Sequence, residues 1–469
     1  MTDDLRTSIP DRLRQLPSVS EMLSLPEVGR LIGPHLRTQV VEAARRVIER
    51  QRELIRAGGT PDLSPEALAR EVEREAISRA RLGQRRVVNA TGVIIHTGLG
   101  RSVLPARALA AVQRELAGYS SLAVDLESGE RAARERHVAE LFCRLTGAEA
   151  STVVNNNAAA TMLVLTVLAQ GREVIVSRGQ LVEIGGSFRI PDVMEQSGAR
   201  LVEVGTTNKT RLSDYEQAIT DQTALLLRVH PSNYRLVGFT DAVPLTDLVA
   251  LGRKHGLPVM DDIGSGLLVD LGAYGLHDEP VAGDSIKAGA DVVTFSCDKL
   301  VGGPQGGGII GKAEPLQRIR KHPLARALRC GKLSLVALES TLRLFLDRDS
   351  LPETNPTFAM LGEDARRIRR RARALAARLR KAVPDADISV EPDESQVGSG
   401  SLPAQPIPTY VVSVGLRGLS PEALARHLRL HQPPILARLH ADRVLFDLRT
   451  VLKGEERLIA DALAGPLAG

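Results

Sequence analysis

The chain has 469 residues, of which 43% are hydrophobic and 25% are charged, and its formal net charge is +5. This length predicts two or three domains, and this hydrophobic content excludes an intrinsically disordered chain. Its three cysteines, Cys143, Cys297 and Cys330, are too few and too widely spaced for a disulfide framework, which favours a reducing, cytoplasmic setting.

Residues 1–84 predict a separate helical domain and contain no apolar signal-peptide core. Residues 57–61 should end one helix, and Ser64 has the residue type of an N-cap for the next. Residues 1–86 also hold sixteen arginines and no lysine. The domain is either a plain helical subdomain that packs on the main body or a domain that binds a polyanion. The second alternative follows from the arginines, because a guanidinium group binds phosphate through two parallel hydrogen bonds. The positions with helical spacing are Leu36, Val40, Ala44, Val47, Gln51 and Leu54.

Residues 85–345 alternate strand-like and helical segments, which predicts a doubly wound, mostly parallel α/β large domain. Ligands of such sheets bind at the carboxyl ends of the strands. The longest strongly apolar run, about 158–169, is too short to cross a bilayer, so we expect a soluble protein without a membrane partner. The expected strands are 152–155, 173–176, 200–204, 224–229, 258–261 and 291–296, and the expected helices include 158–168 and 245–254.

Residues 346–469 predict a small α+β domain, with strands at 409–414 and 443–447 and a helix at 421–429. Its first helix, 364–381, carries eight arginines and one lysine beside an apolar stripe. We interpret that charge as a solvated helix face rather than a nucleic-acid surface.

Lys299 is the most informative single residue. It follows a β-branched strand and precedes a glycine-rich stretch, so it should lie at the mouth of the sheet, partly removed from water. A lysine there can lose its proton and attack a carbonyl, as a Schiff-base lysine does. Taken alone, the pattern also fits a surface lysine after a strand.

Other motifs in the same domain strengthen the first interpretation. The strand-to-helix turn at Asn156, Asn157 and Ala158 predicts a phosphate site at a helix N-terminus. Asp261 and Asp262 end another strand, where one carboxylate suits a protonated ring nitrogen, although acids at this place also fit helix capping. The Ser296 hydroxyl is placed to reach the same phosphate. A phosphate turn, an acid and a lysine in this order are typical of pyridoxal-phosphate (PLP) enzymes of the aspartate aminotransferase fold. The sequence Asp262-Ile-Gly resembles the acid-x-small pattern of this fold, which favours Asp262 over Asp261.

The sequence argues against two other kinds of binding site, a P-loop and a zinc site. The stretch 306–312 resembles a P-loop, but Ala313 stands where a magnesium-binding hydroxyl is required, and the glycines lead into a strand. The sequence also has no zinc-ligand spacing, so we expect no metal site.

Five stretches are specific enough to indicate a family: VNATGVIIHTGLGRS (88–102), YSSLAVDLESGER (119–131), NNNAAA (155–160), SRGQLVEIGGSFRIP (177–191) and SCDKLVGGPQ (296–305). Through these stretches the chain resembles the bacterial selenocysteine synthases, the L-seryl-tRNA(Sec) selenium transferases. The resemblance covers nearly the whole chain, with the ends matching more by layout than by motif.

This resemblance implies a cytoplasmic PLP enzyme that converts L-seryl-tRNA(Sec) to L-selenocysteinyl-tRNA(Sec) with selenophosphate, by loss of water through an aminoacrylyl-tRNA and addition of selenium. It implies a ring-like homodecamer with tRNA held by residues 1–84. Lys299 matches the lysine that holds PLP, and Asp298 and residues 206–208 lie in active-site stretches. The arginines matching the selenophosphate set are Arg101, Arg326 and Arg329.

Two alternatives stay open at this point. Relatives that act as PLP-dependent lyases on a small phosphorylated amino acid or amino sugar acid share the core motifs, but they usually lack the N-terminal helical domain. A catalytically silent RNA-binding protein is the alternative from another class. The presence of Lys299, Asp262 and the phosphate turn together argues against it.

Overall fold

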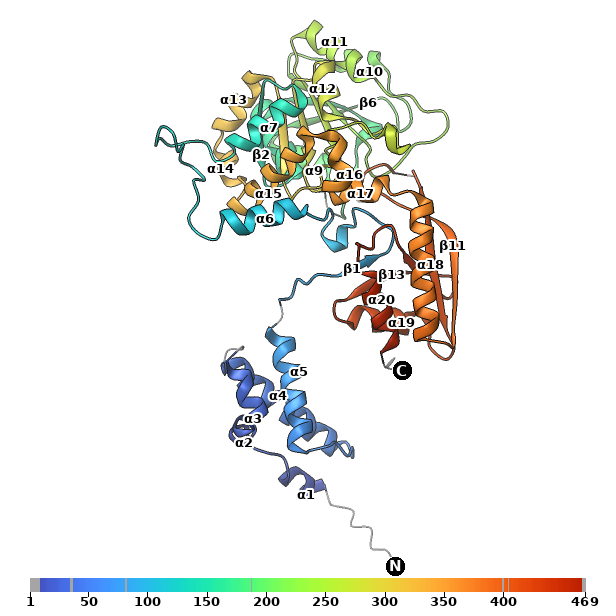
Figure 1. Cartoon of the computed structure of the whole chain (residues 1–469). Helices are drawn as coiled ribbons and strands as arrows, with labels where there is room; N and C mark the ends of the chain where they lie inside the picture. Colours follow the sequence, from blue (N-terminus) through green and yellow to red (C-terminus); the bar gives the residue numbers. More distant parts are fainter. Residues whose placement is uncertain are drawn as a thin grey trace, which may run out of the picture. The chain divides into compact units, whose positions relative to one another are not determined.

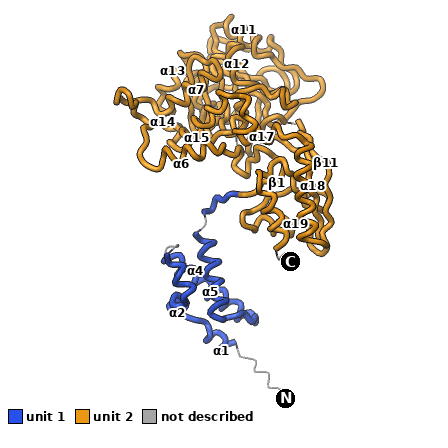
Figure 2. Tube along the Cα trace, viewed as in Figure 1, with its two compact units in different colours: residues 1–86 blue, residues 87–469 orange. Residues whose placement is uncertain are grey.

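The computed structural model describes residues 9–33, 37–80, 82–186, 188–398, 400–403 and 405–465. The chain divides into two compact units, residues 1–86 and residues 87–469 (Figure 2). Among the described residues, no helix combines the length and the apolar character needed to cross a membrane.

All regular secondary structure in the described residues of the N-terminal unit is helical. Its helices are α1 (Ile9–Arg14), α2 (Val19–Ser24), α3 (Pro26–Gly29), a 3-10 turn (Arg30–Ile32), α4 (Arg37–Arg56) and α5 (Pro65–Ala80). Val40, Ala44 and Val47 of α4 lie in its apolar core, as their spacing predicts. Leu54 was expected in that stripe but is 45% exposed, and its neighbour Ile55 is buried instead. Leu36 lies outside the described residues.

A seven-stranded sheet forms the centre of the second unit (Figure 1). Its order is β2-β10-β9-β8-β7-β3-β6, and only β10 runs antiparallel to its neighbours. The other six strands therefore share one carboxyl edge. The strands are β2 (Ala150–Val154), β3 (Glu173–Ser177), β6 (Arg200–Val204), β7 (Thr223–Val229), β8 (Val259–Gly264), β9 (Val292–Ser296) and β10 (Gly307–Gly311).

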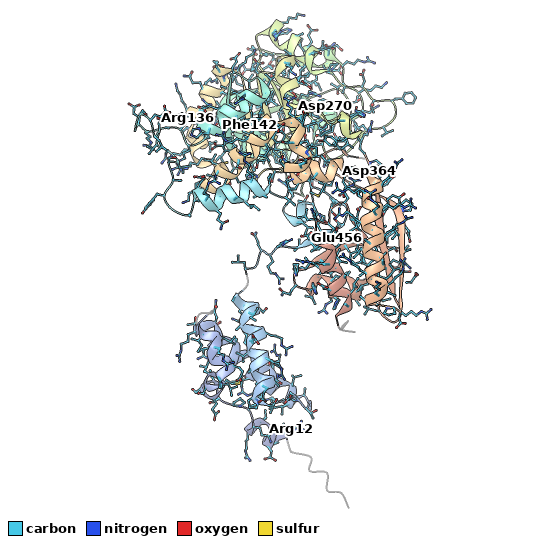
Figure 3. The ribbon with its side chains drawn as sticks, viewed as in Figure 1. Arg12, Arg136, Phe142, Asp270, Asp364 and Glu456 are labelled. Atoms are coloured by element: carbon cyan, nitrogen blue, oxygen red, sulfur yellow. The ribbon has the colours of Figure 1, made fainter. Side chains whose placement is uncertain are left out.

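Helices cover both faces of this sheet, so successive strand residues alternate between two apolar cores. Val153 packs in one core, where the rings of Phe142 and Phe295 meet edge to face at 5.3 Å between centroids, and Val154 packs in the other (Phe142 is labelled in Figure 3). The helices are α6 (Ala106–Glu115), α7 (Arg136–Thr146), α8 (Asn157–Ala169), α9 (Ile190–Ser197), α10 (Leu212–Ala218), α11 (Leu245–His255), α12 (Ala282–Ala288), α13 (Ala313–Lys321), α14 (Pro323–Ala327), α15 (Lys332–Leu342), α16 (Leu351–Thr354) and α17 (Pro356–Gly362). A short hairpin, β4 (Glu183–Ile184) and β5 (Phe188–Arg189), stands beside the sheet.

A second sheet, of five strands, has the order β1-β13-β14-β12-β11. Strand β1 (Val88–Ala90) pairs in parallel with β13 (Ile435–His440), so residues 88–90 join the C-terminal sheet although the sequence prediction placed 85–345 in the large domain. Helix α18 (Ala365–Ala382) packs along β11 (Ala386–Ser395) and β12 (Ile407–Leu416) (Figure 1). The remaining elements are β14 (Arg443–Asp447), α19 (Pro421–Leu430) and α20 (Glu456–Ala464).

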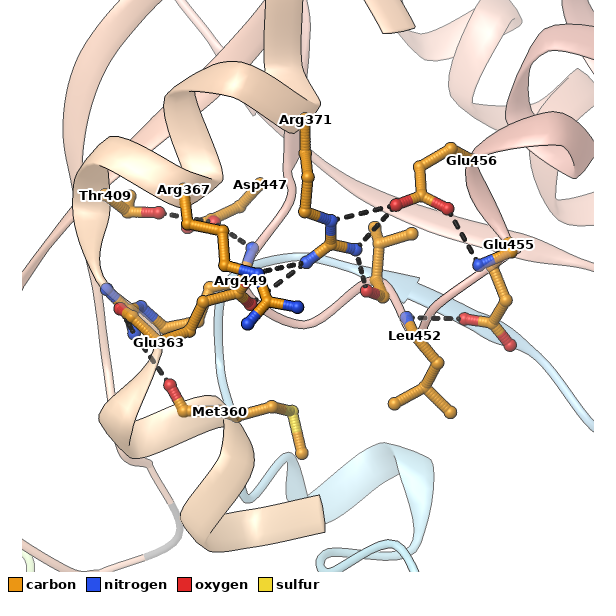
Figure 4. A network of polar contacts seen from close by, with 12 residues as sticks. Met360, Glu363, Arg367, Arg371, Thr409, Asp447, Arg449, Leu452, Glu455 and Glu456 are labelled. Carbon is orange, nitrogen blue, oxygen red and sulfur yellow. Dashed lines mark hydrogen bonds and ion pairs between the residues drawn. The ribbon is translucent and has the colours of Figure 1, made fainter. Parts of the chain in front are cut away.

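A buried arginine ties this sheet to the helices that precede it (Figure 4). Arg449 is 2% exposed and donates hydrogen bonds to the carbonyl oxygens of Met360 (2.7 Å), Glu363 (3.0 Å) and Pro408 (2.7 Å). Arg371 of α18 bridges the carboxylates of Glu363 and Glu456. The turn between α17 and α18 is thereby fixed against the C-terminal strands.

Candidate active site

The carboxyl ends of β2, β8 and β9 bring most of the predicted site residues to one cavity of about 250 Å³. Lys299 follows β9, the Asn156–Asn157 turn follows β2, and Asp262 lies near the end of β8. Parallel strands explain this convergence, because their carboxyl ends meet at the same edge. The predicted residues that line the cavity are Arg101, Asn156, Asn157, Ala158, Asp262, Ser296 and Lys299.

Lys299 is 4% exposed. Burial, and next the charge of Arg101, lower the pKa of its amine below the ordinary lysine value. The Ser102 hydroxyl lies 2.6 Å from the carbonyl oxygens of both Asp298 and Lys299, which holds the lysine's backbone in place. A lowered pKa increases the fraction of neutral amine, which is the form that attacks a carbonyl.

Asp262 is buried and faces this cavity. It accepts hydrogen bonds from Asn157 Nδ2 (2.9 Å), Thr161 Oγ1 (3.0 Å) and the Gly264 amide (3.2 Å). Burial raises the pKa of the Asp262 carboxyl, while the bonds from Asn157 and Thr161 act in the opposite direction. A carboxylate held in this way can pair with a cation inside the cavity.

The turn after β2 forms the N-terminus of α8. The side chain of Asn156 caps the helix by accepting from the Ala159 amide at 2.8 Å. Gly307 of β10 passes so close that a Cβ there would lie 2.1 Å from the Asn156 carbonyl oxygen, so only glycine fits. The first amides of such a helix have no intrahelical acceptor and attract an anion.

Arg101 and Asp298, 197 positions apart in the chain, form an ion pair of 2.7 Å at the cavity. Arg101 has a left-handed backbone with φ of 65°, in the loop that follows three residues of 3-10 helix. The second carboxylate oxygen of Asp298, Oδ1, is buried and has no hydrogen-bond partner among the described residues. The pair therefore keeps an acceptor available beside Lys299.

Arg326 and Arg329 do not line the cavity of Lys299. Both are exposed, Arg326 on α14 and Arg329 just after it, where its backbone bridges Val154 of β2. The charge of Arg134 and then burial and Arg326 lower the pKa of Arg329. Arg134 and Arg326 are therefore close enough to Arg329, near the end of β2, for their charges to act on it.

His230 and Glu279 were not predicted from the sequence. His230 follows β7 and lines the cavity, and its buried Nε2 lies 3.7 Å from Glu279 Oε2. The Glu279 side chain is itself only 1% exposed. The one sequence signal was a histidine directly after an apolar strand, and nothing local indicated its distant acidic neighbour.

Comparison with family models agrees with this geometry. The model described as L-seryl-tRNA selenium transferase matches residues 87–452. The chain belongs to this family. A model described as selenocysteine synthase N terminal matches residues 13–52, within the N-terminal unit.

Curated members of the L-seryl-tRNA selenium transferase family match almost end to end. The L-seryl-tRNA(Sec) selenium transferase of Geobacter sulfurreducens is 49% identical over 453 residues, covering 96% of this chain and 98% of the relative. That of Desulfomicrobium baculatum is 47% identical, covering 97% of this chain and 99% of the relative.

Among solved structures, a D-glucosaminate-6-phosphate ammonia-lyase matches with a TM-score of 0.56 and 22% identity, covering 81% of this chain and 95% of that one. This match concerns the fold alone. Together with the strand order it confirms the predicted class: an aspartate aminotransferase-like α/β large domain with a small α+β domain.

Proposed function

We propose that this protein converts L-seryl-tRNA(Sec) to L-selenocysteinyl-tRNA(Sec) with selenophosphate as the selenium donor and PLP as cofactor. The observation that carries the proposal is the single cavity lined by Lys299, Asp262 and the N-terminus of α8. The chain that contains it is 49% identical to the L-seryl-tRNA(Sec) selenium transferase of Geobacter sulfurreducens.

The residues of the cavity fit PLP. The buried Lys299 amine suits the cofactor's aldehyde, the buried Asp262 carboxylate suits a protonated ring nitrogen, and the turn at Asn156 and Asn157 suits its phosphate. Ser296, 6% exposed, would add a hydroxyl to the phosphate site. Bound PLP supplies an electron sink for a carbanion at the substrate's Cα.

The protein's own groups then have separate tasks. Lys299 would take the Cα proton of the seryl group and return a proton to Cα at the end of the reaction. The hydroxyl leaves Cβ with a proton as water. Selenium from selenophosphate then forms the new bond at Cβ, and cleavage of its selenium–phosphorus bond by water releases phosphate. We assign Arg101, Arg326 and Arg329 to the phosphate of the donor, because guanidinium groups bind such oxygens in pairs. Asp298 orients Arg101 through the 2.7 Å ion pair.

The N-terminal unit would bind the tRNA, and the whole protein would act in the cytoplasm as a homodecamer, a pentamer of dimers. The arginines of α4 support the first of these assignments. Arg45 and Arg46 are exposed, and among the described residues neither has an ion-pair partner.

Incubation of the full-length protein with seryl-tRNA(Sec), PLP and selenium-labelled selenophosphate tests the proposal. We expect label on the aminoacyl ester as selenocysteine. Release of pyruvate or ammonia from a small phosphorylated amino acid, without labelled tRNA, would instead indicate a lyase.

A further inference from the structure

A second cavity, of about 500 Å³, adjoins the cavity of Lys299. Val229 and His230, at the end of β7, line both of them. Of the residues that line the cavity of Lys299, only these two also line the second cavity. Its size falls in the range of pockets that hold small organic ligands. A molecule anchored at Lys299 and extending past His230 would enter it.

Glu279 gives this cavity its chemical preference. Its Oε2 accepts from the Leu402 amide at 3.0 Å, but Oε1 is buried and has no hydrogen-bond partner among the described residues. Burying an acceptor without a donor is costly, so a ligand that donates a hydrogen bond to Oε1 would be favoured. Asp241 and Asp278 line the same cavity.

The buried Glu279 carboxylate disfavours an anion, whereas Asp241 and Asp278 are exposed, so water and salt screen their charges. Two of the cations in the lining are already paired. Arg228 lies 3.2 Å from Asp261, and Arg235 lies 3.4 Å from Asp278. Lys209 also lines the cavity, but it is exposed, so water and salt screen its charge. Selenophosphate and the phosphate of PLP therefore belong elsewhere, and the ligand expected here is a neutral group with hydroxyl donors.

The rest of the lining suits a flat ring. Tyr234, half-buried, donates from its hydroxyl to the Gly179 carbonyl, which fixes the ring, and Leu236, Val243 and Pro244 are apolar. Thr207 and Asn208 add hydroxyl and amide groups at the other side. A base on apolar side chains with a sugar on polar ones is a common division of such pockets.

We propose that this cavity binds the 3′-terminal nucleoside of the seryl-tRNA, and that its free ribose hydroxyl donates a hydrogen bond to Glu279. This inference rests on the proposed function. The serine is esterified to one ribose hydroxyl, so only the ester group separates the Cα at Lys299 from the sugar. The vicinal hydroxyl is then carried past His230, to which Glu279 is adjacent.

Binding of two substrates that differ by one oxygen tests the site. Seryl-tRNA(Sec) with serine on the 3′ oxygen is prepared with a terminal adenosine or a terminal 2′-deoxyadenosine, and equilibrium dissociation constants are measured for the full-length protein. We expect the deoxy form to bind about tenfold or more weakly to the wild type, the scale of a hydrogen bond to a charged group. Glu279→Gln keeps an amide oxygen but loses the negative charge of the acceptor, so the ratio between the two forms should shrink.

Glu216→Gln is the matched control, since it makes the same chemical change on the exposed face of α10, where Glu216 pairs with Lys254. It should keep the wild-type ratio. Equal binding of both forms by the wild type overturns the proposal without any variant, and so does an undiminished ratio in Glu279→Gln. Wild-type protein that makes no selenocysteinyl-tRNA from the ribose substrate refutes the proposed function instead.

Discussion

Asp261 and Asp262 are neighbours in β8, yet different elements bind their carboxylates. Asp261 contacts Arg228 at 3.2 Å and Ser285 at 2.7 Å, whereas Asp262 contacts Asn157 and Thr161 of α8. The alternation of side chains along a strand causes this division. Only Asp262 is left facing the cavity of Lys299.

We therefore predict that Asp262→Asn still binds PLP but loses turnover, because an amide cannot keep the ring nitrogen protonated. Asp261→Asn should instead lose about 1–3 kcal/mol of unfolding free energy, since it weakens a buried contact with Arg228. Turnover and thermal melting of both variants check this. Full turnover in Asp262→Asn together with loss in Asp261→Asn would reverse the assignment.

Lys299 should be the residue that holds PLP covalently. Lys299→Ala is expected to fold normally and to lose the adduct that borohydride reduces in the wild type. Peptide mapping of the reduced wild-type protein should place the label on Lys299. Label on Lys287 or Lys312, whose amines pair with Asp284 and Asp291, would show that the assignment is wrong.

Arg101 should influence how readily that amine reacts. Its charge lowers the pKa of Lys299, so Arg101→Gln should move this pKa up toward the ordinary lysine value. Attachment of PLP to the cofactor-free variant should then need a higher pH than attachment to the wild type. Initial rates between pH 6 and about 10 measure the shift. A midpoint that stays in place or falls would contradict the role of Arg101.

The fold was largely predictable because its strands are short apolar runs separated by helical patterns. The predicted strands at 200–204 and 443–447 match β6 and β14 residue for residue. Strand β11 was not predicted because it contains a proline and several acidic residues. Strand β13 was not predicted because an arginine and a histidine interrupt its apolar residues. The pairing of β1 with β13 joins residues almost 350 positions apart, and no local pattern encodes such a partner.

The site divides in the same way. Lys299, Asp262 and the turn at Asn156 each end a predictable strand, so the sheet alone brings them together. Arg326 and Arg329 came only from the family resemblance, and their contact with a selenium donor stays a prediction. Glu279 was not found, because its role depends on His230 and Leu402, which belong to distant segments.

Arg449 should matter for stability rather than chemistry. Arg449→Met removes donors from three carbonyl groups, those of Met360, Glu363 and Pro408. We expect a loss of about 2–4 kcal/mol of unfolding free energy, since buried acceptors without donors are costly. Denaturant unfolding measures it, with the exposed Arg417→Met as control. Equal stability of the two variants would contradict the prediction.

The last prediction concerns the N-terminal unit. Deleting residues 1–80 should leave a folded core that binds PLP, because the two units are separately compact and all cofactor candidates lie in the second. The truncated protein should bind seryl-tRNA(Sec) much more weakly. Full-length binding should also weaken as salt rises, by release of counterions from the tRNA.

A double variant makes this prediction specific. Arg45→Gln with Arg46→Gln should lower the slope of log affinity against log salt by roughly 1 for each phosphate that the variant no longer neutralises. Arg79→Gln is the control, because Arg79 is already paired with Glu42 at 2.7 Å and Glu75 at 3.1 Å. Fluorescence titrations across a salt series compare all four proteins. Equal tRNA affinity with and without residues 1–80 would make a small-substrate PLP enzyme the better interpretation, since the helical unit is what distinguishes the two.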